Sequence, residues 1–224
     1  MVEPLLQVLE DDVSMKCLGR EENFRKFERY FLNQISQKGY HAVLQSYPDD
    51  RAGYLHGLIH IGLALEFRQP LLLAEGLAQA AVHHYMYKKY LTSTSIPRPE
   101  NIQANGPWTT KWCTMECSHA KPELLRLAAR WRVDPNDLDR ATAELINVAV
   151  YITTGALLSP YRCMFDFYLL HCLTVSVAHA SFLKETSKTN SQKAHLLEYS
   201  GRVFMMTYAG MGCPPLRLDY LCSL

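Results

Sequence analysis

The stretch YLHGLIHIGLALEF, Tyr54 to Phe67, is a long apolar run that reads as helix and contains two histidines. Its apolar composition predicts a helix that lies in or beside a core. His56 and His60 are four residues apart, so a helix holds both imidazoles on one face, one turn apart. Such a pair can chelate a metal ion, and two hydrogen-bonded histidines in a helix interface are the alternative interpretation.

Most of the remaining chain also reads as helix. Apolar residues recur with a period near 3.6, and no segment alternates with period two for long enough to form a strand. The predicted helices cover Glu21–Gln37, ended by Gly39, then Leu71–Leu91 after Pro70, Pro122–Trp131, 139–157, 160–184 and Lys193–Tyr208. We therefore expect an all-α, bundle-like single domain over residues 1–224, in which 92–118 form a loop or insertion.

Two of these helices have predicted starts that contain proline. Asp134 is a candidate N-cap with Pro135 at the first helical position, and Ser159-Pro160 repeats that pattern before the segment that ends at Lys184. Both predictions rest on the preference for short polar side chains at the N-cap and for proline just after it.

Bulk composition excludes several classes of protein. The 224 residues carry a net charge near +1 with a pI near 7.6, which disfavours nucleic acid as a partner. The longest apolar run, Leu145 to Leu158, is short and interrupted by polar residues, so we expect no membrane span. Seven cysteines without a secretory signal favour reduced thiols and a cytoplasmic protein. No glycine-rich dinucleotide motif follows a strand, so a Rossmann cofactor site is not indicated.

Further candidate side chains lie in two other segments. MFDFYLLHCLTVSVAHASFL contains His171 among apolar neighbours and His179 eight residues on, about 80° round a helix, where it could face a shared groove. Asp166 could orient a ring only from a different helix. AVHHYMYKKY supplies His83 and His84, one of which should face inward. A satisfied core histidine is the alternative for each ring.

Three stretches together resemble one known family. HGLIHIGLALEF is similar to the H-P-L-I-H-L-G-x-x-x-E-F segment of the questin-oxidase-like family, and DFYLLHCLTV is similar to its D-F-x-L-M-H segment. LLEYSGRVFMMTYAGMGCPPL resembles its closing L-L-E-W-K-G-R…Y…P segment. The order along the chain agrees, and three ordered motifs are more specific than one.

The resemblance implies an activity and a site. The family is linked to oxidation and ring cleavage of anthraquinone-type polyketides, and some members look like non-haem iron oxygenases. It implies His56, His60 and His171 as ligands of Fe(II), a small aromatic or apolar substrate, and NADPH as a possible external reductant. As substrate-binding residues we predict His83, His84, His179, Glu66 and Asp166.

Three departures from the family pattern leave a second hypothesis open. Gly57 replaces the proline of H-P-L-I-H, Ser200 replaces the lysine of E-W-K-G-R, and the family's upstream H-N-H-x-x-H-H segment does not occur in this sequence. The chain is therefore either an oxygenase or a catalytically inactive helical module that binds an apolar ligand or partner. We also expect exposed apolar surface, covered by a partner or by a second copy of the chain.

Overall fold

The computed structural model describes residues 17–46, 55–82, 121–156, 165–217 and 219. Within these ranges the chain forms eight α-helices and one 3-10 helix, and no strand occurs there, so the predicted all-α class is confirmed. The elements are η1 (Glu21–Asn23), α3 (Phe24–Lys38), α4 (Tyr40–Ser46), α5 (Leu55–Phe67), α6 (Pro70–Val82), α8 (Lys121–Arg130), α9 (Leu138–Gly155), α10 (Phe167–Lys184) and α11 (Asn190–Gly210).

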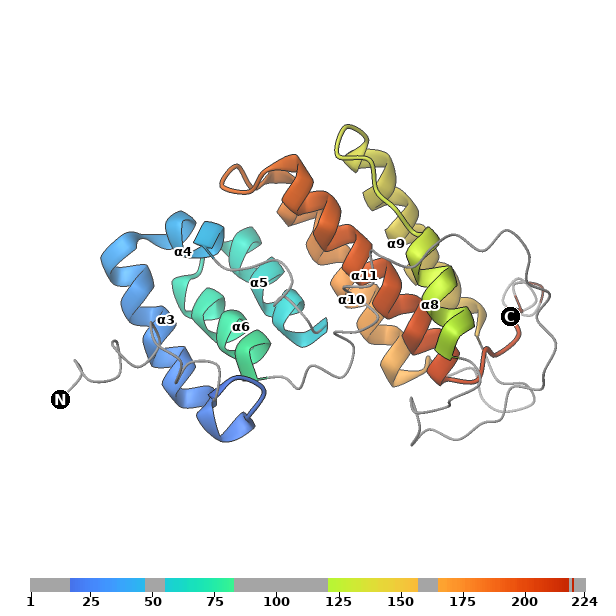
Figure 1. Ribbon diagram of the computed structural model, residues 1–224, viewed down its shortest axis with the longest axis horizontal. Helices are drawn as coiled ribbons and strands as arrows, with labels where there is room; N and C mark the ends of the chain where they lie inside the picture. Colours follow the sequence, from blue (N-terminus) through green and yellow to red (C-terminus); the bar gives the residue numbers. More distant parts are fainter. Residues whose placement is uncertain (1–16, 47–54, 83–120, 157–164, 218, 220–224) are drawn as a thin grey trace.

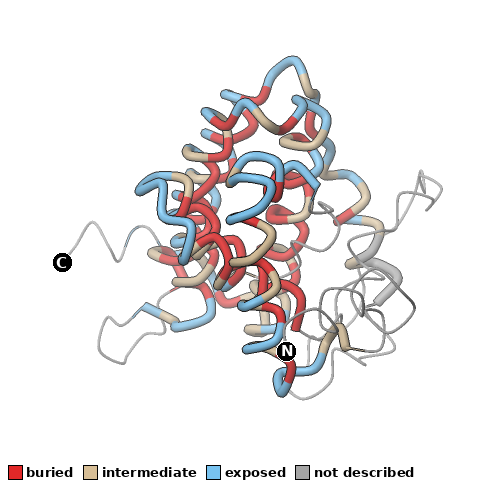
Figure 2. The backbone as a smooth tube through the Cα atoms, turned by 90° about the vertical axis from the view of Figure 1, so that its left-hand side faces the viewer, coloured by how far each residue is buried: buried red, intermediate tan, exposed pale blue. Residues whose placement is uncertain are grey.

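The helices form two groups that meet along one contact (Figure 1). Helices α3 to α6 make the first group, helices α8 to α11 make the second, and α5 packs against α10 to join them. Buried residues line the inward faces of the helices in both groups (Figure 2). A single cluster of buried side chains, including Leu58, Leu77 and Val175, runs through this contact.

Small residues allow α5 to lie close to both of its neighbours. A Cβ atom added at Gly62 would lie 2.2 Å from the Cβ atom of Ala178 on α10. One added at Gly76 on α6 would lie 2.8 Å from the backbone nitrogen of Ile61. A Cβ added at Gly57 would lie 3.1 Å from the carbonyl oxygen of Gly76, a tight contact that a small shift could relieve. Gly62 and Gly76 are therefore the positions where the close approach of the helix backbones leaves no room for a side chain.

These contacts also fix the direction of the helices. His56 lies opposite His171, Gly62 opposite Ala178 and Glu66 opposite Ser181, so α5 and α10 run parallel. The N-termini of both helices consequently lie at the same end of the contact.

The structure corrects two predicted helix starts. Helix α10 begins at Phe167 rather than near Pro160, because Asp166 has extended backbone angles and accepts hydrogen bonds from the amides of Tyr168 and Leu169. Helix α9 begins at Leu138, since the side chain of Asp134 instead accepts from the amide of Asn136 in the preceding turn. At α10 the side chain of Asp166 satisfies amides of the first helical turn, whereas Asp134 closes a turn that precedes α9.

The predicted helix end at Gly39 is confirmed, but the short helix that follows it and the start of α11 were not predicted. Gly39 adopts a positive φ of 86° and separates α3 from a second short helix, α4. Thr189 and Gln192 form a capping box, so α11 begins at Asn190, three residues before the predicted start. The second half of the predicted helix Leu71–Leu91 and the predicted loop 92–118 lie outside the described residues.

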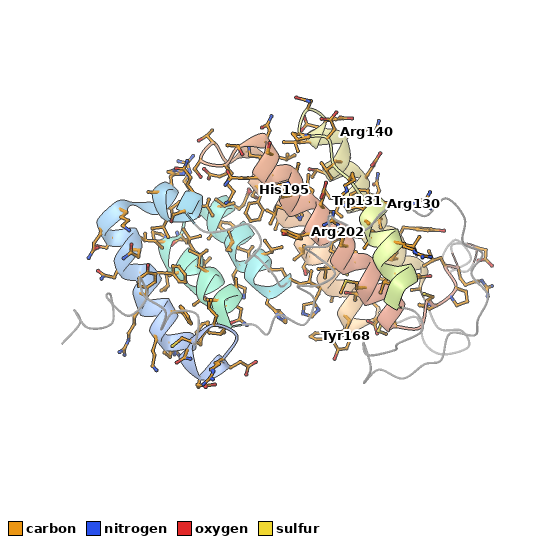
Figure 3. All side chains as sticks on the ribbon, in the orientation of Figure 1. Arg130, Trp131, Arg140, Tyr168, His195 and Arg202 are labelled. Atoms are coloured by element: carbon orange, nitrogen blue, oxygen red, sulfur yellow. The ribbon has the colours of Figure 1, made fainter. Side chains whose placement is uncertain are left out.

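A buried charged pair attaches α8 to α11 and accounts for part of the third family-like motif. The Arg202 guanidinium donates to the carboxylate of Glu198 at 2.7 Å and to the carbonyl of Ala128 at 3.2 Å, near the C-terminal end of α8. The indole of Trp131 donates to the carbonyl of Leu197 at 3.2 Å. Figure 3 labels Arg202 and Trp131 at this contact. The Glu198 and Arg202 positions of the motif therefore hold helices together.

In the described part of the chain, none of the helices has the length and apolar character needed to cross a membrane.

We predict that Gly62→Ala destabilises the fold by about 1–3 kcal/mol, because the added methyl group must push α5 away from Ala178. Gly210→Ala is the control, since nothing lies within 4 Å of a Cβ added there. We expect this control to change stability by no more than about 1 kcal/mol. Urea unfolding measures both variants, and the double variant Gly62→Ala/Ala178→Gly should recover part of the loss. Equal stability of the two alanine variants would contradict the close packing.

Candidate functional site

Two histidines from distant parts of the chain meet at the common end of α5 and α10. His56 lies in the first turn of α5 and His171 in the second turn of α10. Their Nε2 atoms are 2.9 Å apart, and the rings are nearly perpendicular with centroids 4.7 Å apart. His56 is exposed and His171 half-buried, so the pair lies at the surface of the helix contact.

The proton positions of the pair follow from its neighbours. The Nδ1 atom of His171 is 2.6 Å from the carbonyl oxygen of Phe167. A carbonyl can only accept, so His171 donates from Nδ1 and, when neutral, keeps a lone pair on Nε2. His56 then donates its Nε2 proton to that lone pair. A proton therefore bridges the two rings whenever no other group occupies the space.

The geometry of this pair fits two adjacent ligands of one metal ion. Metal–nitrogen bonds of about 2.0–2.1 Å, at angles of roughly 90–110°, place two ligand nitrogens about 2.9–3.4 Å apart. The bond from His171 Nδ1 to a backbone carbonyl is the usual outer contact of a metal-binding histidine. Imidazole nitrogen also suits iron.

His60 does not join this pair directly. Its Nδ1 atom is buried, lies 3.5 Å from Oε1 of Glu75 on α6 and makes no hydrogen bond in the part of the chain that the structure describes. Among the described residues, no three His, Cys, Asp or Glu side chains form a group able to hold a metal. The predicted ligand role of all three histidines stays a prediction.

An exposed aromatic surface borders the histidine pair. Phe165, Phe167 and Tyr168 are 55%, 66% and 46% exposed. The ring of Phe167 meets that of His171 edge to face, with centroids 4.6 Å apart. Figure 3 labels Tyr168 at the same end of the helix. These neighbouring exposed rings make this end of α10 a candidate binding surface.

The other predicted site residues are dispersed. Glu66 lies at the far end of α5, where it accepts a hydrogen bond from the hydroxyl of Ser181 at 2.7 Å. Asp166 is the N-cap of the helix that carries His171. His83 and His84 lie outside the described residues. The predicted contacts of all these residues with substrate remain untested.

His179 has a buried partner that the sequence does not reveal. Its side chain is 2% exposed, and Nε2 lies 2.8 Å from the hydroxyl oxygen of Ser200 on α11. Burial lowers the pKa of His179 to about 3, so the ring is neutral near pH 7. Burial likewise raises the pKa of the Cys172 thiol to about 12, which rules out a reactive thiolate beside His171.

Sequence comparison supplies the family. The sequence matches the questin oxidase-like family over residues 3–111 and 98–224. The chain belongs to the questin oxidase-like family. Its similarity to curated members extends over most of its length.

Three of these relatives come from fungi. This questin oxidase-like chain is 32% identical to oxidoreductase AflY of Aspergillus parasiticus, over 90% of the chain and 48% of the relative. It is 30% identical to a questin oxidase of Aspergillus fumigatus, over 89% of the chain and 54% of that relative. It is 26% identical to Baeyer-Villiger oxidase ptaJ of Pestalotiopsis fici, over 98% of the chain and 57% of that relative. The chain thus spans about half the length of the curated relatives it matches.

Sequence reasoning missed the groups that surround the histidines. Phe167 stands four residues before His171, so its carbonyl lies one helical turn back and is within reach of Nδ1 for a suitable rotamer of the ring, a possibility that the spacing offered. Glu75 stands in the stretch QPLLLAEGLAQAAVH, but its pairing with His60 depends on how α5 packs on α6. Ser200 could not be assigned to His179 without knowing how α10 and α11 face each other.

We predict that His179 makes the fold less stable in mild acid. The unfolded chain binds a proton near pH 6.5 and the folded chain only near pH 3, so the stabilisation is complete above pH 6.5 and is lost as the pH falls from 6.5 towards 3. Between pH 6 and 5 the loss should approach about 1.4 kcal/mol per pH unit. Urea unfolding at pH 7, 6 and 5 measures it.

His179→Gln is the matched variant, because glutamine can still hydrogen-bond Ser200 but does not titrate. It should lose this pH dependence. Desolvation of Glu185 is outweighed by hydrogen bonds from Ser187 and His41, which lower its pKa, and its contribution is the same in both proteins, so the difference between them reports His179. An unchanged slope in the glutamine variant would show that another group is responsible.

Proposed function

We propose that the chain is an oxidoreductase of oxygenase type that acts on a polycyclic aromatic molecule at the α5–α10 contact. The observation that carries the proposal is the pairing of His56 and His171, with Nε2 atoms 2.9 Å apart beside an exposed aromatic surface. The relatives include a questin oxidase and a Baeyer-Villiger oxidase, and these activities support oxidation as the reaction class.

The proposed cofactor is Fe(II), held by Nε2 of His56 and Nε2 of His171. When bound, iron supplies the O2 chemistry that side chains alone cannot perform. The chain's own groups hold and orient it: the Phe167 carbonyl keeps the His171 proton on Nδ1, which leaves Nε2 available. We propose NADPH only as an external reductant.

The aromatic residues orient the substrate in this proposal. A planar ring system can stack on or meet the edge of Phe167, whose exposed ring lies against His171. Tyr168 extends this surface, because its exposed ring meets that of Phe167 edge to face with centroids 5.9 Å apart. Phe165, two residues before Phe167 in the chain, is also exposed. Contact with these rings removes water from the histidines and holds the substrate next to Nε2 of His171.

A second candidate function is an inactive helical binding module. The observation that favours it is that the neutral pair is already satisfied by one N–H···N bond and needs no metal. Within the ranges that the structure describes, no third side chain completes a metal-binding group. Such a module would retain the aromatic surface and bind an apolar ligand without oxidising it.

Metal titration separates the two candidates. We predict that the purified chain binds Fe(II), or Co(II) as a spectroscopic substitute, and that His56→Ala and His171→Ala each weaken binding at least 10-fold by removing a ligand. His195→Ala is the control, since that exposed histidine lies on α11. His60→Ala shows whether the third histidine contributes.

Calorimetry under anaerobic conditions gives the affinities, and absorption of bound Co(II) reports the ligand set. Equal affinity of the wild type and the His171→Ala variant would reject the metal site and favour the inactive module.

Ligand binding to the aromatic surface is a separate prediction. We expect Phe167→Ala to weaken binding of a hydroxyanthraquinone about 5-fold, the equivalent of about 1 kcal/mol for a lost aromatic pair. Phe67→Ala is the matched control, because this ring is similarly exposed, at 62%, but lies at the opposite end of α5. Fluorescence titration measures both affinities, and equal losses would place the ligand elsewhere.

A further inference from the structure

We propose that Asp166 and the Phe167 carbonyl are positioning groups that fix the tautomer and orientation of His171. Asp166 holds the first turn of α10, and that turn holds the imidazole proton on Nδ1. The tautomer itself can be tested in the metal-free chain. Its consequence for metal binding rests on the proposed function.

Asp166 accepts three hydrogen bonds from amides at the start of the helix. Its side-chain Oδ1 accepts from the amide of Tyr168 at 2.8 Å and from the amide of Leu169 at 3.1 Å. Its carbonyl accepts from the amide of Leu170 at 2.9 Å. These bonds satisfy amides that a helix start otherwise leaves free, and they order the turn that contains Phe167.

The carbonyl of Phe167 transmits this order to the ring. It lies 2.6 Å from His171 Nδ1, and in an α-helix the same oxygen also accepts the backbone amide of the residue four positions on. The imidazole therefore has a fixed acceptor only while the first turn keeps its helical shape. If that turn frays, the ring can exchange its proton between Nδ1 and Nε2.

Two neighbouring rings limit rotation of the imidazole. Phe167 contacts it at an interplanar angle of 80° and His56 at 88°, with centroid distances of 4.6 and 4.7 Å. The carbonyl selects the tautomer, and the two rings keep Nε2 directed at His56. Asp166 thus acts on the pair through the backbone of the first turn, because its side chain accepts from the amides of Tyr168 and Leu169 and the Phe167 carbonyl contacts the ring.

Nuclear magnetic resonance of 15N-labelled imidazoles tests the inference in the metal-free chain, at a pH where histidine is neutral. We expect His171 of the wild type to be protonated on Nδ1. Asp166→Ala should give a mixture of tautomers, and Asp166→Ser, which can still cap the helix, should restore the wild-type signal.

Thr189→Ala is the matched control. It removes the N-cap of α11, a different helix, and should lower the melting temperature to a similar extent without changing His171. Titration with Co(II) adds a second readout: Asp166→Ala should bind about 10-fold more weakly, and Asp166→Ser should bind like the wild type.

The outcomes distinguish the inference from the proposed function. The positioning role is supported, even if no metal binds, by one pattern of tautomers. In this pattern the His171 proton lies on Nδ1 in the wild type, is shared between the two nitrogens in Asp166→Ala and returns to Nδ1 in Asp166→Ser. If no metal binds, only the proposed metal site fails. A mixture of tautomers in the wild type, no change in Asp166→Ala, or the same change in Thr189→Ala would overturn the inference.

Discussion

The close parallel packing of α5 against α10 is the contact on which the rest of the molecule depends. Gly62 has no side chain, and Ala178 has a single methyl group, so the two backbones approach closely. This contact joins the two helix groups and sets the distance between His56 and His171, which are 115 residues apart in sequence. The stability of the core and the geometry of the candidate site therefore share one cause.

Much of the fold could be predicted from the sequence because most helices carry strong periodic apolar faces. The residues at which the helices begin and end were harder to predict. Asp166 and Thr189 compete with nearby proline and polar residues as start signals, and the choice depends on which free amides the local turn presents. Gly39 divides α3 from α4 through a positive φ that a reading based on periodicity treats only as an end.

The candidate site was predictable in part. His56 and His171 were singled out by their motifs, and the structure brings them together. His60 lies one turn beyond His56 on the same helix but faces Glu75, because α6 packs on that side of α5. Ser200, which departs from the family-like motif, serves as the buried partner of His179. The packing of one helix on another determines such partners, and a single sequence does not show which helices pack together.

Parallel helices also have an electrostatic effect. Each N-terminus carries about half a positive charge from its aligned peptide dipoles, and the histidine pair joins the first turn of α5 to the second turn of α10. The carboxylate of Asp166 offsets part of this field, but Asp166 lies at the cap of only one of the two helices. The potential around the pair is therefore more positive than the start of a single helix would make it, a setting that favours negatively charged atoms over positively charged ones.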